Sequence, residues 1–278
     1  DVVSQAFNIL DTLMEHGGAG ILPFEDESAI KQFYEAITNI LSEQAPCFFK
    51  DEFKDDRSES GQAALEAACI FLGNYAHWLG PRFAVEVLTD DIYNKLELFT
   101  NTTRPDSFRE CTVACIAEIV EFSGVAILPR LAGIFNLALH LFNDKAANVR
   151  HNALFLLGEC ATATIRGPCN LTIPNERIPQ VMQELSQFII PPSQYESAKS
   201  NLRDLSDNAT SAGIKLHLAY PAVLGTQVLP QLLSSLPFKN DLLEALKIVV
   251  LLPRLYELFP DVSRQFTAVF IRQIATVI

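Results

Sequence analysis

Residues 65–79 read LEAACIFLGNYAHWL, and their apolar side chains recur at the spacing of one helix face. The recurring positions are Leu65, Ala68, Cys69, Leu72, Ala76 and Leu79. This i, i+3, i+4, i+7 pattern is typical of an amphipathic α-helix that buries one side, whereas a strand would alternate at every second residue. The stretch therefore predicts a helix.

The same spacing recurs at residues 131–142 and 242–252. Its apolar positions are Leu131, Ile134, Phe135, Ala138, Leu141 and Phe142 in the first stretch, and Leu242, Ala245, Leu246, Val249 and Leu252 in the second. No alternating run bounded by Asn-Gly or Asp-Gly occurs in the sequence, so strands are not indicated. The pattern predicts an all-α protein.

The predicted helices come in pairs. The six helical hairpins span residues 2–44, 60–100, 106–142, 147–190, 203–235 and 241–277, about 46 residues for each pair. This period is that of HEAT-type repeats, whose hairpins cannot bury their apolar faces alone and stack into a superhelix. We expect residues 1–278 to form one HEAT-repeat solenoid with an extended concave face.

Prolines mark the predicted second helices at 82–100, 128–142, 175–190 and 225–235. They are Pro81, Pro129, Pro179 and Pro230. Proline is tolerated in the first helical turn because the N–H it lacks would have no partner there. Pro253 is different, since it falls inside the helical pattern 241–258, and it predicts a kink or a split near Leu251 and Leu252.

The chain of 278 residues carries 33 acidic and 21 basic side chains, a net charge of −12, and 49% of its residues are hydrophobic. This much apolar content excludes intrinsic disorder. The acidic balance argues against nucleic-acid binding, which needs a basic surface, and suits a basic partner or serves solubility alone. The most apolar region, 113–142, is interrupted by Glu118, Glu121, Pro129 and Arg130, so we expect no membrane insertion.

The cysteines and histidines give no clear metal site or cofactor site. Cys111 and Cys115 share a helix face and could supply two ligands, but no second pair occurs at zinc-like spacing. His140 and His151 flank one predicted turn and are either close together or merely surface residues. With no CxxC pair, buried free thiols in a reducing cytosolic or nuclear setting are the simpler interpretation.

Catalytic motifs are also missing from the sequence. It contains no Walker loop, no G-x-S-x-G and no H-E-x-x-H, so we expect a binding protein and no enzyme. Trp78 ends an amphipathic helix and is expected in the core, although an exposed anchor for a partner is the alternative. The chain begins at Asp1 and stops within an apolar periodic run, so we expect it to be part of a longer protein.

Residues 143–158, NDKAANVRHNALFLLG, resemble the D-x-x-x-x-V-R-x-N-A-x-x-x-x-G signature of HEAT repeats in the importin-β family. In this pattern an acidic residue interacts with amides at the helix start, apolar positions face the core, a glycine allows close helix approach, and an arginine commonly bridges to a neighbouring repeat. The corresponding residues are Asp144, Val149 and Ala153, Gly158, and Arg150.

Two later stretches are similar to the importin-4-like branch of that family. Residues 207–212, DNATSA, resemble its D-N-A-x-x-A helix start, and residues 228–241, VLPQLLSSLPFKND, resemble the L-P-x-L-L-x-x-L-P-[LF]-K-x-D stretch that follows. The three matches cover residues 144–241 in the family's order. One departure is Lys215, where the family often has arginine.

The resemblance implies a nuclear transport receptor that shuttles between cytoplasm and nucleus. Such receptors bind basic cargo of the histone or ribosomal-protein type in the cytoplasm, contact Phe-Gly nucleoporins at the pore, and release the cargo when GTP-bound Ran GTPase binds them. The Ran contacts of the family lie in N-terminal repeats, so the resemblance places them outside this chain. The alternative is a HEAT-repeat scaffold that organises a multiprotein complex and has no role in transport.

The candidate partner-binding residues are polar positions that the apolar stripes do not explain. In this architecture the second helices line the concave face, and acidic side chains there would attract a Lys/Arg-rich segment. They are Glu86, Asp90, Asp91, Glu97, Glu176, Glu184 and Gln187, joined by Asp51, Asp55 and Asp56 in the charged stretch 48–61. A solvated helix face and a solvated connection are the alternatives.

Overall fold

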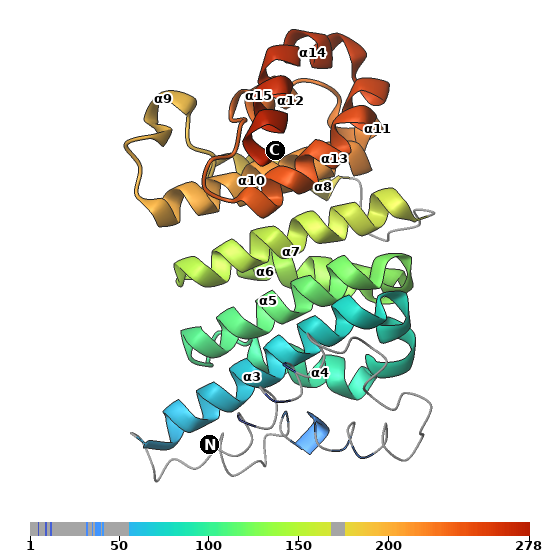
Figure 1. Cartoon of the computed structure of the whole chain (residues 1–278), viewed down its shortest axis with the longest axis vertical. Helices are drawn as coiled ribbons and strands as arrows, with labels where there is room; N and C mark the ends of the chain where they lie inside the picture. Colours follow the sequence, from blue (N-terminus) through green and yellow to red (C-terminus); the bar gives the residue numbers. More distant parts are fainter. Residues whose placement is uncertain are drawn as a thin grey trace. The chain divides into compact units, whose positions relative to one another are not determined.

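The computed structural model describes residues 56–167 and 176–278, with a few scattered positions before residue 42. All regular elements in these ranges are helical, which confirms the all-α prediction (Figure 1). The chain divides into two compact units, residues 1–127 and 128–278. Most of the hairpin predicted at 2–44 lies outside the described residues.

The first unit is built on two long helices, α3 (Asp56–Leu79) and α5 (Asp106–Ser123), which pack along each other. The π-helical turn η2 (Phe83–Val87) contacts both helices, and α4 (Asp90–Phe99) packs on α5. All six positions of the predicted stripe in residues 65–79 are buried. The periodicity therefore gave the buried side of α3 correctly.

The single helix predicted over 82–100 is in fact two elements. The chain leaves η2 at Leu88, and Thr89 adopts an extended conformation before α4 begins. The Thr89 hydroxyl accepts a hydrogen bond from the amide of Ile92 at 3.3 Å, which caps the new helix. A threonine cap followed by two aspartates is a helix start, so the break has a local cause.

The second unit is a layer of three long helices with shorter helices on it. The long helices are α7 (Ala147–Arg166), α10 (Ser200–Ala219) and α13 (Leu242–Leu258). α10 packs against both α7 and α13. The predicted apolar stripe in residues 131–142 is buried where α6 packs on α7.

The shorter elements of the second unit join these long helices. They are α6 (Leu131–Leu141), α8 (Arg177–Ser186), α9 (Pro192–Tyr195), α11 (Pro221–Leu224), α12 (Leu229–Ser234), α14 (Pro260–Gln265) and α15 (Thr267–Val277). α8 and α12 pack on α10, and α14 and α15 pack on α13. The 3₁₀ segment η3 (Gly124–Arg130) leads from α5 into α6.

The prolines mark helix starts only in part. Pro230 lies in the first turn of α12 as predicted, and Pro179 is the third residue of α8. Pro129 lies in η3, before α6 begins. α13 does not split at Pro253, since it continues as one helix from Leu242 to Leu258. The alternative expectation, a kink at this residue, stays a prediction. Pro253 is on the exposed side of α13, where water can satisfy the carbonyl that loses its helical partner.

The apolar stripe predicted at residues 242–252 is only half buried. Ala245 and Leu252 are in the core, but Leu242 is 54% exposed and Leu246 is 50% exposed. The period was correct for a helix, but the buried side of α13 is narrower than the apolar pattern. Two of the stripe's leucines therefore lie on an outer surface.

Gly158 permits a close contact between α7 and α10, as the signature motif predicted. A Cβ atom built on Gly158 would lie 3.5 Å from the Cα atom of Ala212 and 3.2 Å from Cδ of Lys215. We therefore expect Gly158→Val to lower the free energy of unfolding by about 2 kcal/mol, since a branched side chain there overpacks the interface. Urea denaturation measures this, with the exposed Gln183→Val on α8 as the matched control. An equal loss in both variants would contradict the close-contact explanation.

By length and composition alone, residues 106–141 could also cross a membrane. They comprise α5, η3 and α6, and half of their most apolar 18-residue window is buried in the structure. A core helix of a folded domain meets the same criteria, so this one run is weak evidence for a membrane span.

Candidate functional site: an acidic surface and a buried charge cluster

Four of the predicted binding residues lie in the first unit, on η2 and at the exposed side of α4. Glu86, Asp90, Asp91 and Glu97 are all exposed. On α4 the apolar residues Ile92, Leu96 and Phe99 face inward, and the acidic ones occupy the opposite side. The first unit therefore presents a local acidic surface, which we define by these four carboxylates.

Two of these carboxylates form ion pairs with basic side chains of the same unit. Arg82 contacts Glu86 through two nitrogens, at 2.8 and 2.9 Å, and this hydrogen bonding lowers the pKa of Glu86. Lys95 lies 3.1 Å from Asp91 and also donates to the backbone oxygen of Thr38. Exposed pairs of this kind are weak, so a basic partner can compete for both carboxylates.

Of the remaining predicted residues, three lie in the second unit, and the other three precede or begin α3 in the first unit. Glu176 directly precedes α8 and is exposed, as is Gln187 at its end. Glu184 is half-buried and accepts a hydrogen bond from Gln180 at 2.9 Å. Asp51 and Asp55 lie outside the described residues, and Asp56 is the first residue of α3, with its side chain not described.

Trp78 is not in the core. It is 40% exposed at the end of α3, with its ring edge-on to His77. The apolar stripe of α3 includes Leu79 but turns away from Trp78, so the prediction of burial was wrong. Val85 and Leu98 are exposed in the same unit, and Leu98 shares the outer side of α4 with the carboxylates.

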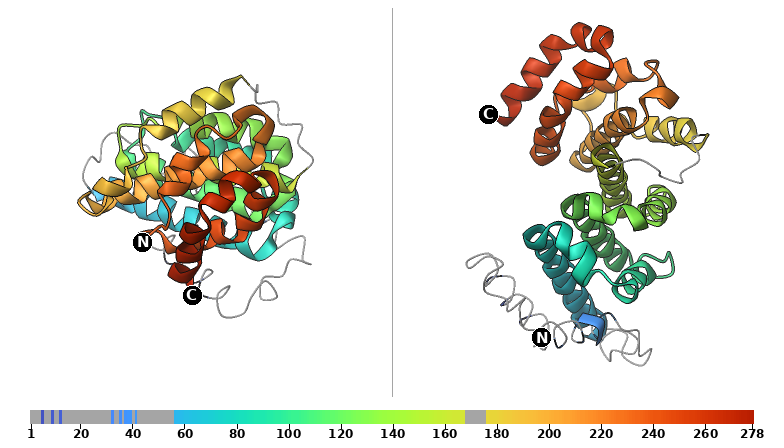
Figure 2. Two further views of the ribbon diagram at one scale, coloured as in Figure 1. Left: turned by 90° about the horizontal axis from the view of Figure 1, so that it is seen from above. Right: turned by 90° about the vertical axis from the view of Figure 1, so that its right-hand side faces the viewer.

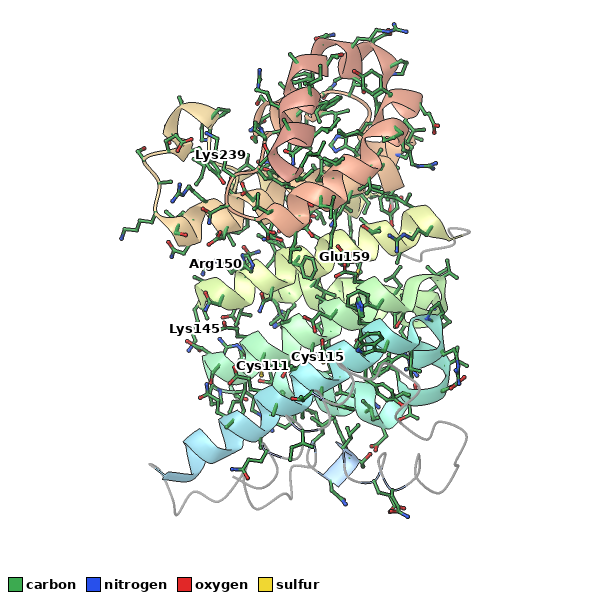
Figure 3. All side chains as sticks on the ribbon, viewed as in Figure 1. Cys111, Cys115, Lys145, Arg150, Glu159 and Lys239 are labelled. Carbon is green, nitrogen blue, oxygen red and sulfur yellow. The ribbon has the colours of Figure 1, made fainter. Side chains whose placement is uncertain are left out.

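Three cysteines of the first unit, Cys69, Cys111 and Cys115, lie close together. Cys111 and Cys115 lie on α5 (Figure 3). Cys69 on α3 is close enough to both to form hydrogen bonds with them. A hydrogen bond with Cys69, together with burial, raises the pKa of Cys111, so its thiol stays protonated and is a poor ligand. Across the described residues, no group of three or more His, Cys, Asp or Glu side chains could hold a metal ion.

The residues of the signature motif lie in the loop before α7 and on the buried side of that helix. The Asp144 carboxylate accepts the backbone amide of Ala146, the residue before α7, at 2.8 Å, and so contacts the loop rather than an amide of the helix itself. Val149 and Ala153 are fully buried. Arg150 donates to the backbone oxygens of Asp144 and Lys145 at 2.7 and 3.0 Å, and these contacts stabilise the loop that precedes α7.

A buried charge cluster, which the sequence did not reveal, joins the three long helices of the second unit. It consists of Glu159 on α7, Lys215 on α10, and Glu244 and Lys247 on α13. The Lys215 ammonium lies 2.8 Å from Glu159 and 2.9 Å from Glu244. Lys247 lies 3.3 Å from each of the same carboxylates and 4.2 Å from the centre of the Phe155 ring.

The two positive and two negative charges of this cluster stabilise one another, with Lys215, Glu159 and Glu244 buried and Lys247 26% exposed at the edge of the cluster. Burial by itself raises the pKa of Glu244, but the charges of Lys215 and Lys247 outweigh it and hold that pKa below its usual range. Burial likewise opposes the charge of Lys215, yet Glu159 and Glu244 raise its pKa. Lys215 and Glu244 are therefore expected to be charged at neutral pH.

A second polar centre lies at the start of α13 and is formed around Asp207 of α10. The Asp207 carboxylate accepts the Tyr195 hydroxyl at 2.7 and 2.8 Å and the backbone amides of Asn240 and Asp241. Burial raises the pKa of Asp207 to about 6, although these hydrogen bonds oppose the rise. This residue begins the D-N-A-x-x-A stretch, and its contacts connect α9, α10 and the loop before α13.

A comparison with protein-family models and with curated proteins finds no match for this chain. The described residues define the chain as an all-helical protein of many packed helices.

Proposed function

We propose that this chain is part of a HEAT-type helical-repeat receptor that binds basic protein segments through the acidic surface of η2 and α4. The observation that carries the proposal is the exposure of all four carboxylates, Glu86, Asp90, Asp91 and Glu97. The exposed Leu98 beside them offers an apolar contact to the same partner. Complementary charge of this kind speeds capture and selects a Lys/Arg-rich segment.

The arrangement of helices within each unit supports the repeat interpretation. In the second unit α10 is covered by one long helix on each side, and the short α8 and α12 pack on it as the second members of hairpins do. In the first unit the long α3 and α5 pack together, with α4 on α5. These are the contacts expected of stacked hairpins, in which each repeat touches its neighbours.

The importin-β resemblance makes this proposal more specific. The partner would be basic cargo such as a histone or ribosomal protein, and the longer protein would carry it between cytoplasm and nucleus. Phe-Gly nucleoporins and Ran GTPase would be further partners, with the Ran contacts outside this chain. Asp144, Val149, Ala153 and Gly158 support the resemblance through the local roles described above.

We expect the triple variant Glu86→Lys, Asp90→Lys, Asp91→Lys to bind a Lys/Arg-rich histone-tail peptide at least tenfold more weakly, because repulsion replaces attraction. Fluorescence anisotropy at low and physiological salt measures the loss. The matched control reverses three exposed acids of the second unit, Glu196, Glu257 and Asp261. The neutral variant Glu86→Gln, Asp90→Asn, Asp91→Asn removes the attraction without adding repulsion, so it should lose less affinity than the lysine variant. This comparison separates the effect of charge on binding from an effect on helix capping.

Equal affinity in the triple variant and in its control, with unchanged circular dichroism, would refute the acidic surface as the binding site. Retention on immobilised Phe-Gly peptides distinguishes the transport receptor from a scaffold. A chain that binds the basic peptide but not Phe-Gly repeats would fit a scaffold that organises a complex.

A further inference from the structure

Nine residues between α8 and α10 lie mostly outside the packed core of the second unit. They are residues 191–199, which include the short helix α9. Among them Tyr195 is buried and Ala198 is half-buried, and the other seven are exposed. Figure 1 shows α9 beside the start of α10, and the view from above shows the same end of the long helices (Figure 2). We call residues 191–199 the strap.

The buried side chain of the strap ends on a buried carboxylate. The Tyr195 hydroxyl lies 2.8 and 2.7 Å from the two carboxylate oxygens of Asp207, which is 1% exposed. The Tyr195 ring also lies 6.0 Å from the guanidinium group of Arg203 on α10. A buried hydroxyl and a buried carboxylate that satisfy each other are costly to separate, because each then needs another partner. We call the contact of Tyr195 with Asp207 the latch.

Two further side-chain contacts of the strap lie at the surface. Glu196 pairs with Lys239, and these side chains are 65% and 54% exposed. The Ser197 hydroxyl donates to the Gln194 carbonyl at 2.9 Å, within the strap itself. An exposed ion pair contributes little to stability, and a bond inside the strap does not attach it to the rest of the unit. The latch is therefore the stronger attachment of the strap.

Both ends of the strap are attached to the core. Before the strap, Ile189 is buried and the Ile190 amide donates to the Ser206 hydroxyl of α10 at 2.9 Å. After the strap, α10 begins at Ser200, and every residue of this helix from Leu205 to Leu218 is buried. Segments with few buried contacts open locally while the core stays folded. An opening of the strap can therefore be confined to its nine residues.

The groups that act on Asp207 come from each element that packs on it. The strap supplies the Tyr195 hydroxyl, and the loop before α13 supplies the backbone amides of Asn240 and Asp241. These hydrogen bonds lower the pKa of Asp207, whereas burial and the charge of Asp241 raise it, and burial is the largest effect. The result is a pKa of about 6. Asp207 can therefore gain or lose its proton within the range in which the protein stays folded.

Neighbouring titratable groups contact the adjacent asparagines. The Asn208 side-chain amide lies 3.4 Å from the His151 ring of α7 and 3.4 Å from an Asp241 carboxylate oxygen. The Asp204 carboxylate accepts the side-chain amide of Asn240. Asp207 is therefore the carboxyl group that the strap itself covers.

Opening of the strap takes the Tyr195 ring off Asp207 and lets water reach the carboxyl. Because burial is the largest effect on the pKa of Asp207, its relief outweighs the loss of the Tyr195 hydrogen bond, and the pKa falls toward the ordinary value near 3.9. The closed strap then keeps the proton at a pH where the opened strap has released it. The proton thus favours the closed strap, fully below about pH 4, and this preference is lost as pH rises through 6.

We propose that the strap opens as a unit while the second unit stays folded, that the contact of Tyr195 with Asp207 is its latch, and that loss of the Asp207 proton loosens it. The long helices stay together during this opening because the charge cluster joins them away from the strap. The device is closed most firmly in acid and opens more readily at neutral pH. It does not depend on the acidic surface or on the function proposed for it.

The test is cleavage after Glu196 by a glutamate-specific endoprotease, identified by mass spectrometry. A peptide of residues 187–203 gives the rate for an open strap, so the ratio of the two rates measures the open fraction. We expect the unaltered chain to be cleaved at least a hundredfold more slowly than the peptide, and the cleaved chain to keep its circular dichroism. Tyr195→Phe, measured against a peptide with the same change, should raise the ratio at least tenfold. The matched control Tyr256→Phe removes a surface contact with Thr267 and should leave it unchanged.

The ratio should also rise between pH 4.5 and pH 7.5. The limit is about 25-fold, which applies if the opened carboxyl has the pKa of an unfolded aspartate. In Asp207→Asn the ratio should stay flat over this range, because the titrating group is gone.

Four results would overturn the proposal. They are cleavage of the unaltered chain as fast as the peptide, cleavage at Glu196 only together with complete digestion, an unchanged ratio in Tyr195→Phe, and a ratio in the unaltered chain that stays flat or falls with pH. Thermal unfolding of each variant shows whether it is folded, and Tyr195→Phe tests the latch even if Asp207→Asn does not fold.

Discussion

Replacing Lys215 by methionine is expected to lower the free energy of unfolding by about 3 kcal/mol or more. Lys215 is the central cation of the charge cluster, and it contacts Glu159 and Glu244 from between α7 and α13. Methionine fills most of the same volume, so the loss comes from two buried carboxylates that keep Lys247 as a cation but lose Lys215. Removing one partner of a buried pair costs far more than the pair contributes net, because the remaining charge cannot return to water.

Chemical denaturation of Lys215→Met measures this loss, and two further variants identify its cause. Lys239→Met removes an exposed lysine paired with Glu196, and we expect little change there because water screens that pair. The triple variant Glu159→Gln, Lys215→Met, Glu244→Gln removes the stranded charges as well, and it should regain much of the stability. A triple variant as unstable as Lys215→Met would show that packing and not charge is responsible.

The second large effect expected is a pH dependence of the free energy of unfolding, and it originates at Asp207. Its pKa of about 6 in the folded protein lies above the value near 3.9 of an unfolded aspartate. Between these values the folded carboxyl keeps its proton while the unfolded one has lost it, so the folded state binds more protons. The contribution of this group to stability is therefore full below about pH 4 and falls as pH rises through 6.

We expect the difference in unfolding free energy between the unaltered chain and Asp207→Asn to fall by about 2–3 kcal/mol from pH 4 to pH 7. Taking this difference cancels the titration of the other carboxylates. Tyr195→Phe is the matched control, because loss of the Tyr195 hydroxyl removes a hydrogen bond that lowers the pKa of Asp207. In the Tyr195→Phe variant the Asp207 carboxyl should therefore titrate at higher pH, which a carbon-detected NMR titration measures. A difference that stays flat or rises with pH would contradict this account.

Periodicity predicted the helices of this chain well wherever one side is buried and the other is solvated. The stripe in residues 65–79 and the stripe in 131–142 are buried as expected. Helix breaks were harder to predict, because Thr89 competes locally with continuation of a helix. Pro253 shows the reverse case, in which a residue expected to break a helix is accommodated on its exposed side.

The candidate site was predicted less completely than the fold. Exposed acids such as Glu86 and Asp90 follow from their position opposite an apolar stripe, but their local pairing with Arg82 and Lys95 depends on side-chain geometry. The charge cluster joins residues 56 and 29 positions apart, which no local pattern connects. A signal did exist: Glu159 and Lys215 are isolated charges within apolar runs, and buried charges need partners.

The central position of α10 determines how the second unit can open. Every residue from Leu205 to Leu218 is buried, and the helix carries both Lys215 and Asp207. Its amide groups can reach water only after α7 or α13 has separated from it. The amides of α10 should therefore exchange with solvent at the rate of global unfolding of this unit, while the more exposed α15 exchanges through smaller openings. By this reasoning α10 is the slowest-exchanging segment of the second unit, and α7 and α13 can detach from it only by disrupting the charges that they share.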